Sequence, residues 1–367
     1  MMSGDYARTP VTIVLIALNL GIFAAMLMHG AGWWHSPNAV QLAWGANFGP
    51  ATKDGEWWRL ASAPFLHFGV LHLAMNMWAL WDGGRLVERL YGSLRLLSIY
   101  VASGLAGNLL SLIVQGDRAV SGGASGAIFG VYGALLICLW RERRQVDAGE
   151  FRWLFWGAFV FTAAAVGLGY AIPGIDNSSH VGGLVCGTLL GVVFARPLAD
   201  HSPRLGASRW LAAGALTVAV AVLLRLVPDP AYRWHEEMHA REAISHFLSD
   251  DKRITERWQS ILDSGKAEEG TFEDLAGRIE ADVALGYRES FEALSALHLD
   301  PDAPSAVTLE VLRRYALLRG DAARSLAEAL RLHDRERARE ALEMARRAPY
   351  VARGVEPPPK GGGPLTQ

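Results

Sequence analysis

Residues 120–133 read VSGGASGAIFGVYG, and Ser125 stands where this glycine-rich stretch becomes an apolar one. No charged residue follows until Arg141. Lipid satisfies no backbone N–H or C=O group, so an apolar run in a membrane forms a helix. The pattern predicts a helix that begins at Ser125, where free N–H groups and the helix dipole favour a developing negative charge. Gly126, Gly130 and Gly133 also fit close packing against a second helix, so this stretch alone leaves catalysis and packing open.

The composition indicates a membrane protein. Of the 367 residues, 51% are hydrophobic and 20% are charged, less charge than soluble chains normally carry. Seven apolar segments occur in the first two-thirds of the chain, and most approach the roughly 20 residues that cross ~30 Å of hydrocarbon. They are 11–28, 65–81, 96–114, 125–140, 153–172, 181–195 and 210–224. We therefore expect an all-α polytopic membrane protein.

The fourth and sixth segments have only 15 or 16 residues. Helices this short begin below the membrane surface, where polar backbone is tolerated only inside protein or beside water. Positive residues concentrate in the connections that follow the second, fourth and sixth segments: Arg85, Arg89, Arg95, Arg141, Arg143, Arg144, Arg152, Arg196, Arg204 and Arg209. Positive connections stay in the cytoplasm, so the N-terminus is expected inside and Ser125 on the extracytoplasmic side.

Two polar residues lie inside the second segment. His72 and Asn76 are four residues apart and share one face of a helix. Polar groups at this depth are costly unless they face a cavity or the interior of the bundle. They could donate hydrogen bonds to an oxyanion, or they could join neighbouring helices. His67, nearer the start of the segment, is expected to meet water.

A histidine precedes the sixth segment. His180 is followed by Gly183 and Gly187, whose four-residue spacing allows this helix to approach the fourth one closely. That packing would bring His180 to the depth of Ser125, as a general base beside a nucleophile. No Asp or Glu lies within the seven segments, so a dyad is expected and a Ser-His-Asp triad is not. Phe129, one turn after Ser125, could pack on the catalytic partner or fill the core.

The composition changes after the seventh segment. Residues 231–353 are rich in Arg, Glu, Ala and Leu at helical spacing, which predicts a soluble α-helical domain. The Pro- and Gly-rich end predicts a disordered tail. We divide the chain into a core at 1–200, a seventh transmembrane helix at 201–227, a soluble domain at 228–353 and the tail at 354–367. The helical domain is a candidate for binding a protein partner, and the net charge of −2 gives no indication of a nucleic-acid partner.

Residues 235–239 match the zinc-protease motif H-E-x-x-H. His235 and His239 would bind the metal, with Glu236 as the base. No convincing third ligand follows, and so short a match carries a real risk of being a false positive. We therefore expect no metal and no cofactor, and we keep a zinc peptidase as an alternative.

Together, the motifs of the first 200 residues resemble the rhomboid family of intramembrane serine proteases. The matching motifs, in this order, are Trp58-Arg59, His72-x-x-x-Asn76, Gly123-Ala-Ser125-Gly126 and His180-x-x-Gly183-x-x-x-Gly187. The resemblance covers roughly residues 10–200 and implies a six-helix bundle. The seventh helix occurs only in some members, and the resemblance does not extend to the C-terminal domain.

The resemblance implies a role for each matched residue. Ser125 would be the nucleophile and His180 the general base, with an oxyanion site made by His72, Asn76 and the Ser125 N–H. Supporting residues would be Gly123 in the loop that cradles the oxyanion, Phe129 stacked on His180, Trp58-Arg59 in the first outer loop, and Gly126, Gly183 and Gly187 between helices. Glu88, in Gly83-Gly84-x-x-x-Glu88, matches a family position on the cytoplasmic side and is expected to be structural.

We therefore expect a serine endopeptidase, embedded in a bacterial plasma or inner membrane if the source is bacterial. Its substrates would be transmembrane helices of membrane proteins, cut near the extracytoplasmic surface without ATP or metal. One alternative is a catalytically inactive rhomboid-like protein that binds membrane helices. A channel or transporter is another, but it predicts intramembrane charges or paired broken helices that the segments do not clearly show.

Overall fold

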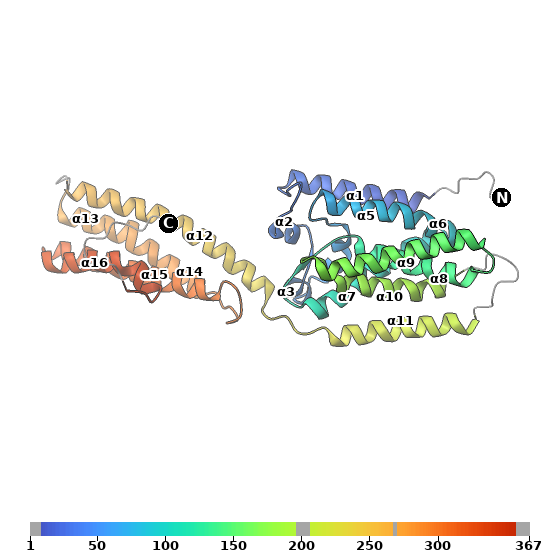
Figure 1. The fold of residues 1–367 in the computed structure, drawn as a ribbon. Coiled ribbons are helices and arrows are strands. Elements are labelled where there is room, and N and C mark those ends of the chain that lie inside the picture. The colour runs from blue at the N-terminus through green and yellow to red at the C-terminus, as the bar shows by residue number, and fades with distance from the viewer. Residues whose placement is uncertain (1–8, 196–205, 267–269, 357–367) are drawn as a thin grey trace. The chain divides into compact units, whose positions relative to one another are not determined.

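The computed structural model describes residues 9–195, 206–266 and 270–356. The chain divides into two compact units, Met1–Pro230 and Ala231–Gln367, and both are built from helices (Figure 1). Three parts of the predictions fall outside the described residues: the cytoplasmic N-terminus at 1–8, the connection at 196–205 and the tail from 357 onward.

The first unit is a helical bundle. Its elements are α1 (Pro10–Met28), α2 (Asn38–Ala43), α3 (Gly49–Lys53), α4 (Arg59–Ser62), η1 (Ala63–Phe65), α5 (Val70–Ala79), η2 (Leu80–Gly84), α6 (Arg85–Tyr91), α7 (Ser93–Gln115), α8 (Ser125–Glu142), α9 (Ala148–Ala171), α10 (Asn177–Phe194) and α11 (Gly206–Leu226). Among the described helices, α1, α7, α9, α10 and α11 are long and apolar enough to cross a membrane. The predicted all-α polytopic fold is confirmed, whereas the number of seven spans stays a prediction.

The second and sixth predicted segments begin at other residues than expected. The second starts with the short turn η1, and α5 begins only at Val70. Gly69, just before it, passes very close to another part of the chain. A Cβ on Gly69 would lie 2.3 Å from the carbonyl oxygen of Trp34. The sixth helix, α10, begins at Asn177 because the Asp176 carboxylate accepts a hydrogen bond from the Ser179 N–H and caps it. His180 therefore lies inside the first turn of the helix.

Helices α8 and α10 lie side by side, and α7 packs against both (Figure 1). Glycines form their contact. A Cβ on Gly183 would lie 1.9 Å from the carbonyl oxygen of Gly126, and one on Gly187 would lie 2.0 Å from that of Gly130. The two backbones thus approach to a distance that leaves no room for a side chain at these positions.

A short strand pair joins two connections of the first unit. β1 (Asn47–Phe48) pairs antiparallel with β2 (Val120–Ser121), and Asn47 lies opposite Ser121. The pairing fixes the long connection after α1 to the segment that leads into α8. The position of Ser125 therefore depends on both connections.

The second unit has its own apolar core. Its helices are α12 (Trp234–Lys266), α13 (Phe272–Ile279), η3 (Glu280–Ala284), α14 (Leu285–Ser295), α15 (Ala306–Arg331) and α16 (Arg335–Ala352). Helix α15 packs against α13, α14 and α16. Tyr287, Ile261 and Ile279 are among the fully buried side chains of this core.

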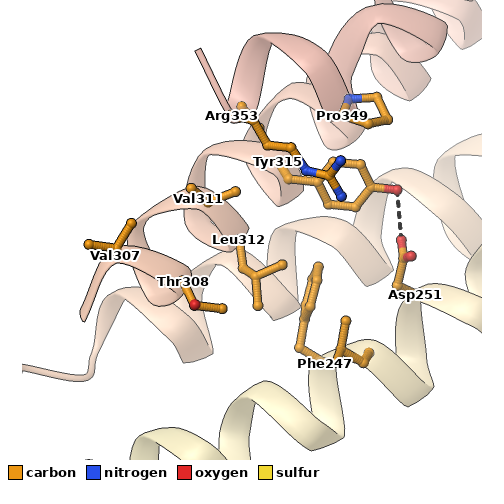
Figure 2. A pocket seen from close by; sticks show the side chains of 11 residues that line it. Phe247, Asp251, Val307, Thr308, Val311, Leu312, Tyr315, Pro349 and Arg353 are labelled. Carbon is orange, nitrogen blue, oxygen red and sulfur yellow. Dashed lines mark hydrogen bonds between the residues drawn. The ribbon is translucent and has the colours of Figure 1, made fainter. Parts of the chain in front are cut away.

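A pocket of about 470 Å³ lies between α12, α15 and α16 of the second unit (Figure 2). Phe247 and Leu312 contribute apolar surface to it. At its wall, Asp251 accepts hydrogen bonds from the hydroxyls of Tyr315, at 3.0 Å, and Tyr287, at 2.7 Å. Burial raises the pKa of the Tyr315 hydroxyl, so this group remains a protonated donor to the carboxylate.

Candidate active site

Ser125 and His180 come together where α8 and α10 begin. The Nε2 atom of His180 lies 2.9 Å from the Oγ atom of Ser125, a hydrogen-bond distance. The His180 side chain is buried, and its ring stacks on Phe129 with 4.3 Å between centroids and 12° between planes. Stacking and burial hold the imidazole with one nitrogen on the hydroxyl, an arrangement that suits a nucleophile and a general base.

His72 lies against the loop that precedes Ser125. A Cβ on Gly123 would lie 2.8 Å from Cε1 and 2.9 Å from Nε2 of His72, and 3.8 Å from the Ser125 Oγ. Gly123 also has a φ of +139°, which favours glycine strongly. Gly123 therefore serves twice: it permits the loop conformation and leaves room for the imidazole beside Ser125.

Two other members of the expected oxyanion site already make hydrogen bonds. The Gly123 N–H donates to the Ala63 carbonyl at 2.9 Å, so this residue shapes the loop and offers no free N–H. The Asn76 amide donates to the backbone carbonyl of His72 at 2.8 Å. A primary amide has a second N–H, which remains available for a ligand. Among the described contacts, no hydrogen bond joins Asn76 to Ser125.

Trp58 and Arg59 organise the connection between α1 and α5. The buried guanidinium of Arg59 donates to the carbonyls of Leu42, at 2.8 Å, and Ala46, at 3.1 Å, and pairs with Glu56. It also lies 4.8 Å from the ring centroid of Trp58, within cation–π distance. The described contacts of Trp58 and Arg59 are with residues of this connection, and none of these contacts is with Ser125 or His180.

Glu88 binds the start of another helix. Its carboxylate accepts hydrogen bonds from the N–H groups of Val11 and Thr12, at 3.0 and 2.9 Å, and from the hydroxyls of Thr12 and Ser93, both at 2.7 Å. Burial by itself would raise the pKa of Glu88, but these hydrogen bonds outweigh it and hold the pKa below its ordinary value. The carboxylate thus caps α1, whose own N-cap residue, Thr9, makes no side-chain cap.

Two positions differ from the expectation. His67, expected to meet water, is fully buried with its ring 5.1 Å from that of His72. Asp176 is not among the predicted site residues. The prediction considers carboxylates only within the apolar segments, and Asp176 lies just before the sixth of them. Its signal in the sequence is an aspartate, a preferred N-cap residue, four residues before His180 and just ahead of the sixth apolar segment.

The H-E-x-x-H segment lies at the start of α12 in the second unit. Both His235 and His239 are exposed, whereas the neighbouring Glu237 is buried and accepts hydrogen bonds from the Ser305 N–H and hydroxyl. Within the part of the chain that the structure describes, no group of three or more His, Cys, Asp or Glu side chains could hold a metal ion. The motif thus has no third ligand among these residues.

Comparison with known proteins matches residues 54–197 to the rhomboid domain. The chain is 38% identical to Rhomboid protease GluP of Bacillus subtilis (strain 168), over 58% of this chain and 39% of that protein. It is 39% identical to RHOMBOID-like protein 5 of Arabidopsis thaliana, over 40% of this chain and 47% of that one. Rhomboid-like protease 1 of Toxoplasma gondii is 32% identical, over 50% of this chain and 61% of its own length.

The chain thus spans less than two thirds of the length of each of these relatives. The matched domain contains Trp58 and Arg59, His72 and Asn76, and both Ser125 and His180. The segments outside it include α1, α11 and the whole of the second unit. On the strength of the domain match and the relatives, residues 54–197 of this chain form a rhomboid domain.

Proposed function

We propose that this protein is an intramembrane serine endopeptidase. The observation that carries the proposal is the 2.9 Å contact between His180 Nε2 and Ser125 Oγ, at the start of a helix in an apolar bundle. The names of two relatives, Rhomboid protease GluP and Rhomboid-like protease 1, support protease activity. Its substrates are transmembrane helices of membrane proteins in the same bilayer.

In the first step, Ser125 Oγ attacks the scissile carbonyl carbon while His180 Nε2 takes its proton. The ring of Phe129 keeps the imidazole plane fixed as the ring becomes charged. The carbonyl oxygen becomes an oxyanion and accepts hydrogen bonds from the Ser125 N–H at the start of α8, from His72 and from the second N–H of Asn76.

In the second step, His180 returns the proton to the leaving amine, and the acyl-enzyme forms. Water then attacks the ester while His180 accepts a proton from it, and His180 passes this proton to Ser125 Oγ as the acyl–oxygen bond breaks and the new carboxylate leaves. A substrate helix must unwind locally before Ser125 can attack it, because the N–H and C=O groups of a helical peptide bond are held in the hydrogen bonds of the helix. Helix-breaking Gly or Pro near the cleaved bond therefore favours cleavage.

The site opens to the extracytoplasmic side in this proposal. Its support is the charge of the connections: Arg85, Arg89 and Arg95 follow the second apolar segment, and Arg141, Arg143, Arg144 and Arg152 follow the fourth. Positive connections remain in the cytoplasm, and α8 begins at its opposite end, with Ser125. Cleavage then falls near the outer surface of the membrane.

The test is cleavage of a model transmembrane substrate in proteoliposomes. We expect the wild type to cut it, Ser125→Ala and His180→Ala to lose cleavage, and Glu236→Ala to retain it. Cleavage that survives in Ser125→Ala and stops with a chelator would overturn the dyad in favour of zinc chemistry. Substrate binding without cleavage in the wild type would identify an inactive binder of membrane helices.

A further inference from the structure

We propose that Asp176 is a positioning residue that holds Ser125 and His180 in register, an inference that rests on the proposed protease function. Asp176 lies immediately before α10. Its side chain joins three parts of the first unit: helix α7, the strand β2 that leads toward Ser125, and the first turn of α10.

The carboxylate receives hydrogen bonds from all three parts. Its Oδ2 atom accepts from the hydroxyls of Ser111 in α7, at 2.5 Å, and Ser121 in β2, at 2.7 Å. Its Oδ1 atom accepts from the Ser179 N–H in α10, at 3.1 Å. Hydrogen bonds to an ionised carboxylate are shorter and roughly twice as strong as neutral ones, and the two hydroxyl distances fall in that short range.

On the α10 side, Asp176 sets where the helix starts. The side chain caps the first turn, and the Asp176 carbonyl accepts the His180 N–H at 3.3 Å. The backbone of His180 is therefore held by the same residue that binds β2. A shift of the cap moves the imidazole relative to the Ser125 hydroxyl.

On the loop side, Ser121 is bound from two directions. Its hydroxyl donates to Asp176, and its backbone pairs with Asn47 across the two strands. The segment from Ser121 to Ser125 is then fixed again where the Gly123 N–H donates to Ala63. Asp176 is thus the one described side chain that hydrogen-bonds both the loop before the nucleophile and the helix of the base.

A residue that only caps a helix does not need hydrogen bonds from other elements, such as those that Asp176 accepts from Ser111 and Ser121. Asp147 caps α9, and the described hydrogen bonds that it accepts come from the N–H groups of Gly149 and Glu150, within its own helix. Asp147→Ala therefore removes a cap of the same chemistry and supplies the matched control for Asp176→Ala. Either variant loses the hydrogen bonds of one helix cap.

The experiment measures turnover per active site in the full-length protein. Active sites are titrated with a fluorophosphonate probe, and kcat and KM are measured for a model transmembrane substrate. We expect Asp176→Ala to lower kcat per titrated site by about 10- to 100-fold with little change in KM, since small misplacements of reacting groups have effects of this size. Ser121→Ala and Ser111→Ala should show smaller losses, Asp176→Asn an intermediate one, and Asp147→Ala none.

Hydrogen exchange gives a second measurement that needs no activity. We expect faster backbone exchange both at 120–125 and at 177–183 in Asp176→Ala, and in neither segment in Asp147→Ala. Unchanged kcat per site, or faster exchange confined to 177–183, would reduce Asp176 to a helix cap and overturn the inference. A wild type without labelling or cleavage would instead count against the proposed function, and the exchange result would still decide whether Asp176 links the two segments.

Discussion

At the scale of single residues, the candidate site depends on positions whose backbone conformation and close neighbours restrict the type of residue. Gly123 combines a φ of +139° with contact to the His72 ring, and His180 combines stacking on Phe129 with a hydrogen bond to Ser125. The chemistry of Ser125 and His180 is common to many proteins. Their neighbours determine whether the two groups meet in a reactive geometry.

Gly123→Ala tests this dependence. The new Cβ would clash with His72 and the backbone would be strained, so we expect a loss of cleavage rate of about 100-fold or more and a cost of about 1–3 kcal/mol in stability. The matched control is Gly55→Ala, because Gly55 has a φ of +110° but a Cβ added there would have no atom within 4 Å. Equal losses of cleavage rate in both variants would show that strain alone matters and that contact with His72 does not.

At the scale of elements, the contact between α8 and α10 brings the two reactive residues together. The backbones touch at Gly126 and Gly183 and again at Gly130 and Gly187. Helices in lipid gain little from hydrophobic burial, so close van der Waals packing holds such a pair together. The separation of the two helices sets the distance between Ser125 and His180.

Gly183→Ala should push the two helices apart. We expect a stability loss of about 1–3 kcal/mol from overpacking and a clear loss of cleavage, measured by thermal unfolding in detergent and by turnover. Gly157→Ala, in α9, is the control, since a Cβ added there would meet nothing within 4 Å. A Gly183→Ala variant with full activity would contradict the close packing of α8 on α10.

The hydrogen bonds that the Glu88 carboxylate makes at the start of α1 predict that the stability of the protein depends on pH. Its folded pKa lies below the ordinary value of 4.5, so the stabilisation it provides is present above that ordinary value and is lost as the pH falls through the folded pKa. Thermal unfolding in detergent should therefore show the wild type losing stability on acidification below about pH 5, and Glu88→Gln losing less. An identical pH dependence in both proteins would exclude Glu88 as the cause.

At the scale of the whole molecule, the two units have separate cores and separate chemistry. The first carries the rhomboid domain. In the second, Asp251 accepts hydrogen bonds from the half-buried Tyr315, which lines the pocket with it (Figure 2), and from the buried Tyr287. We expect residues 231–356 to fold alone, with helical circular dichroism and one cooperative unfolding transition.

Tyr315→Phe should lower the stability of the isolated second unit by about 1 kcal/mol, because Asp251 loses one of its two tyrosine donors. Chemical unfolding followed by circular dichroism measures the change. Leu332→Ala, at an exposed position just after α15, is a control that should change little. A stabilised Tyr315→Phe variant would show that the hydroxyl is not needed there.

The sequence predicts the fold class and the residue at which α8 begins, whereas other parts of the frame around the candidate site differ from the prediction. The start of α8 at Ser125 is predictable because glycines give way there to an apolar run, and the all-α membrane fold follows from composition. The start of α10 differs from the prediction because a cap such as Asp176 lies outside the apolar pattern. The positive φ of Gly123 and the burial of His67 depend on long-range contacts that no local pattern contains.

The central claim is that Ser125 is a nucleophile activated by His180. The most direct test is to react the purified protein with a fluorophosphonate probe and map the modified residue by mass spectrometry. The account predicts modification at Ser125 in the wild type, none there in Ser125→Ala, and a strong reduction in His180→Ala. Modification of another serine, or undiminished labelling of Ser125 in His180→Ala, would contradict it.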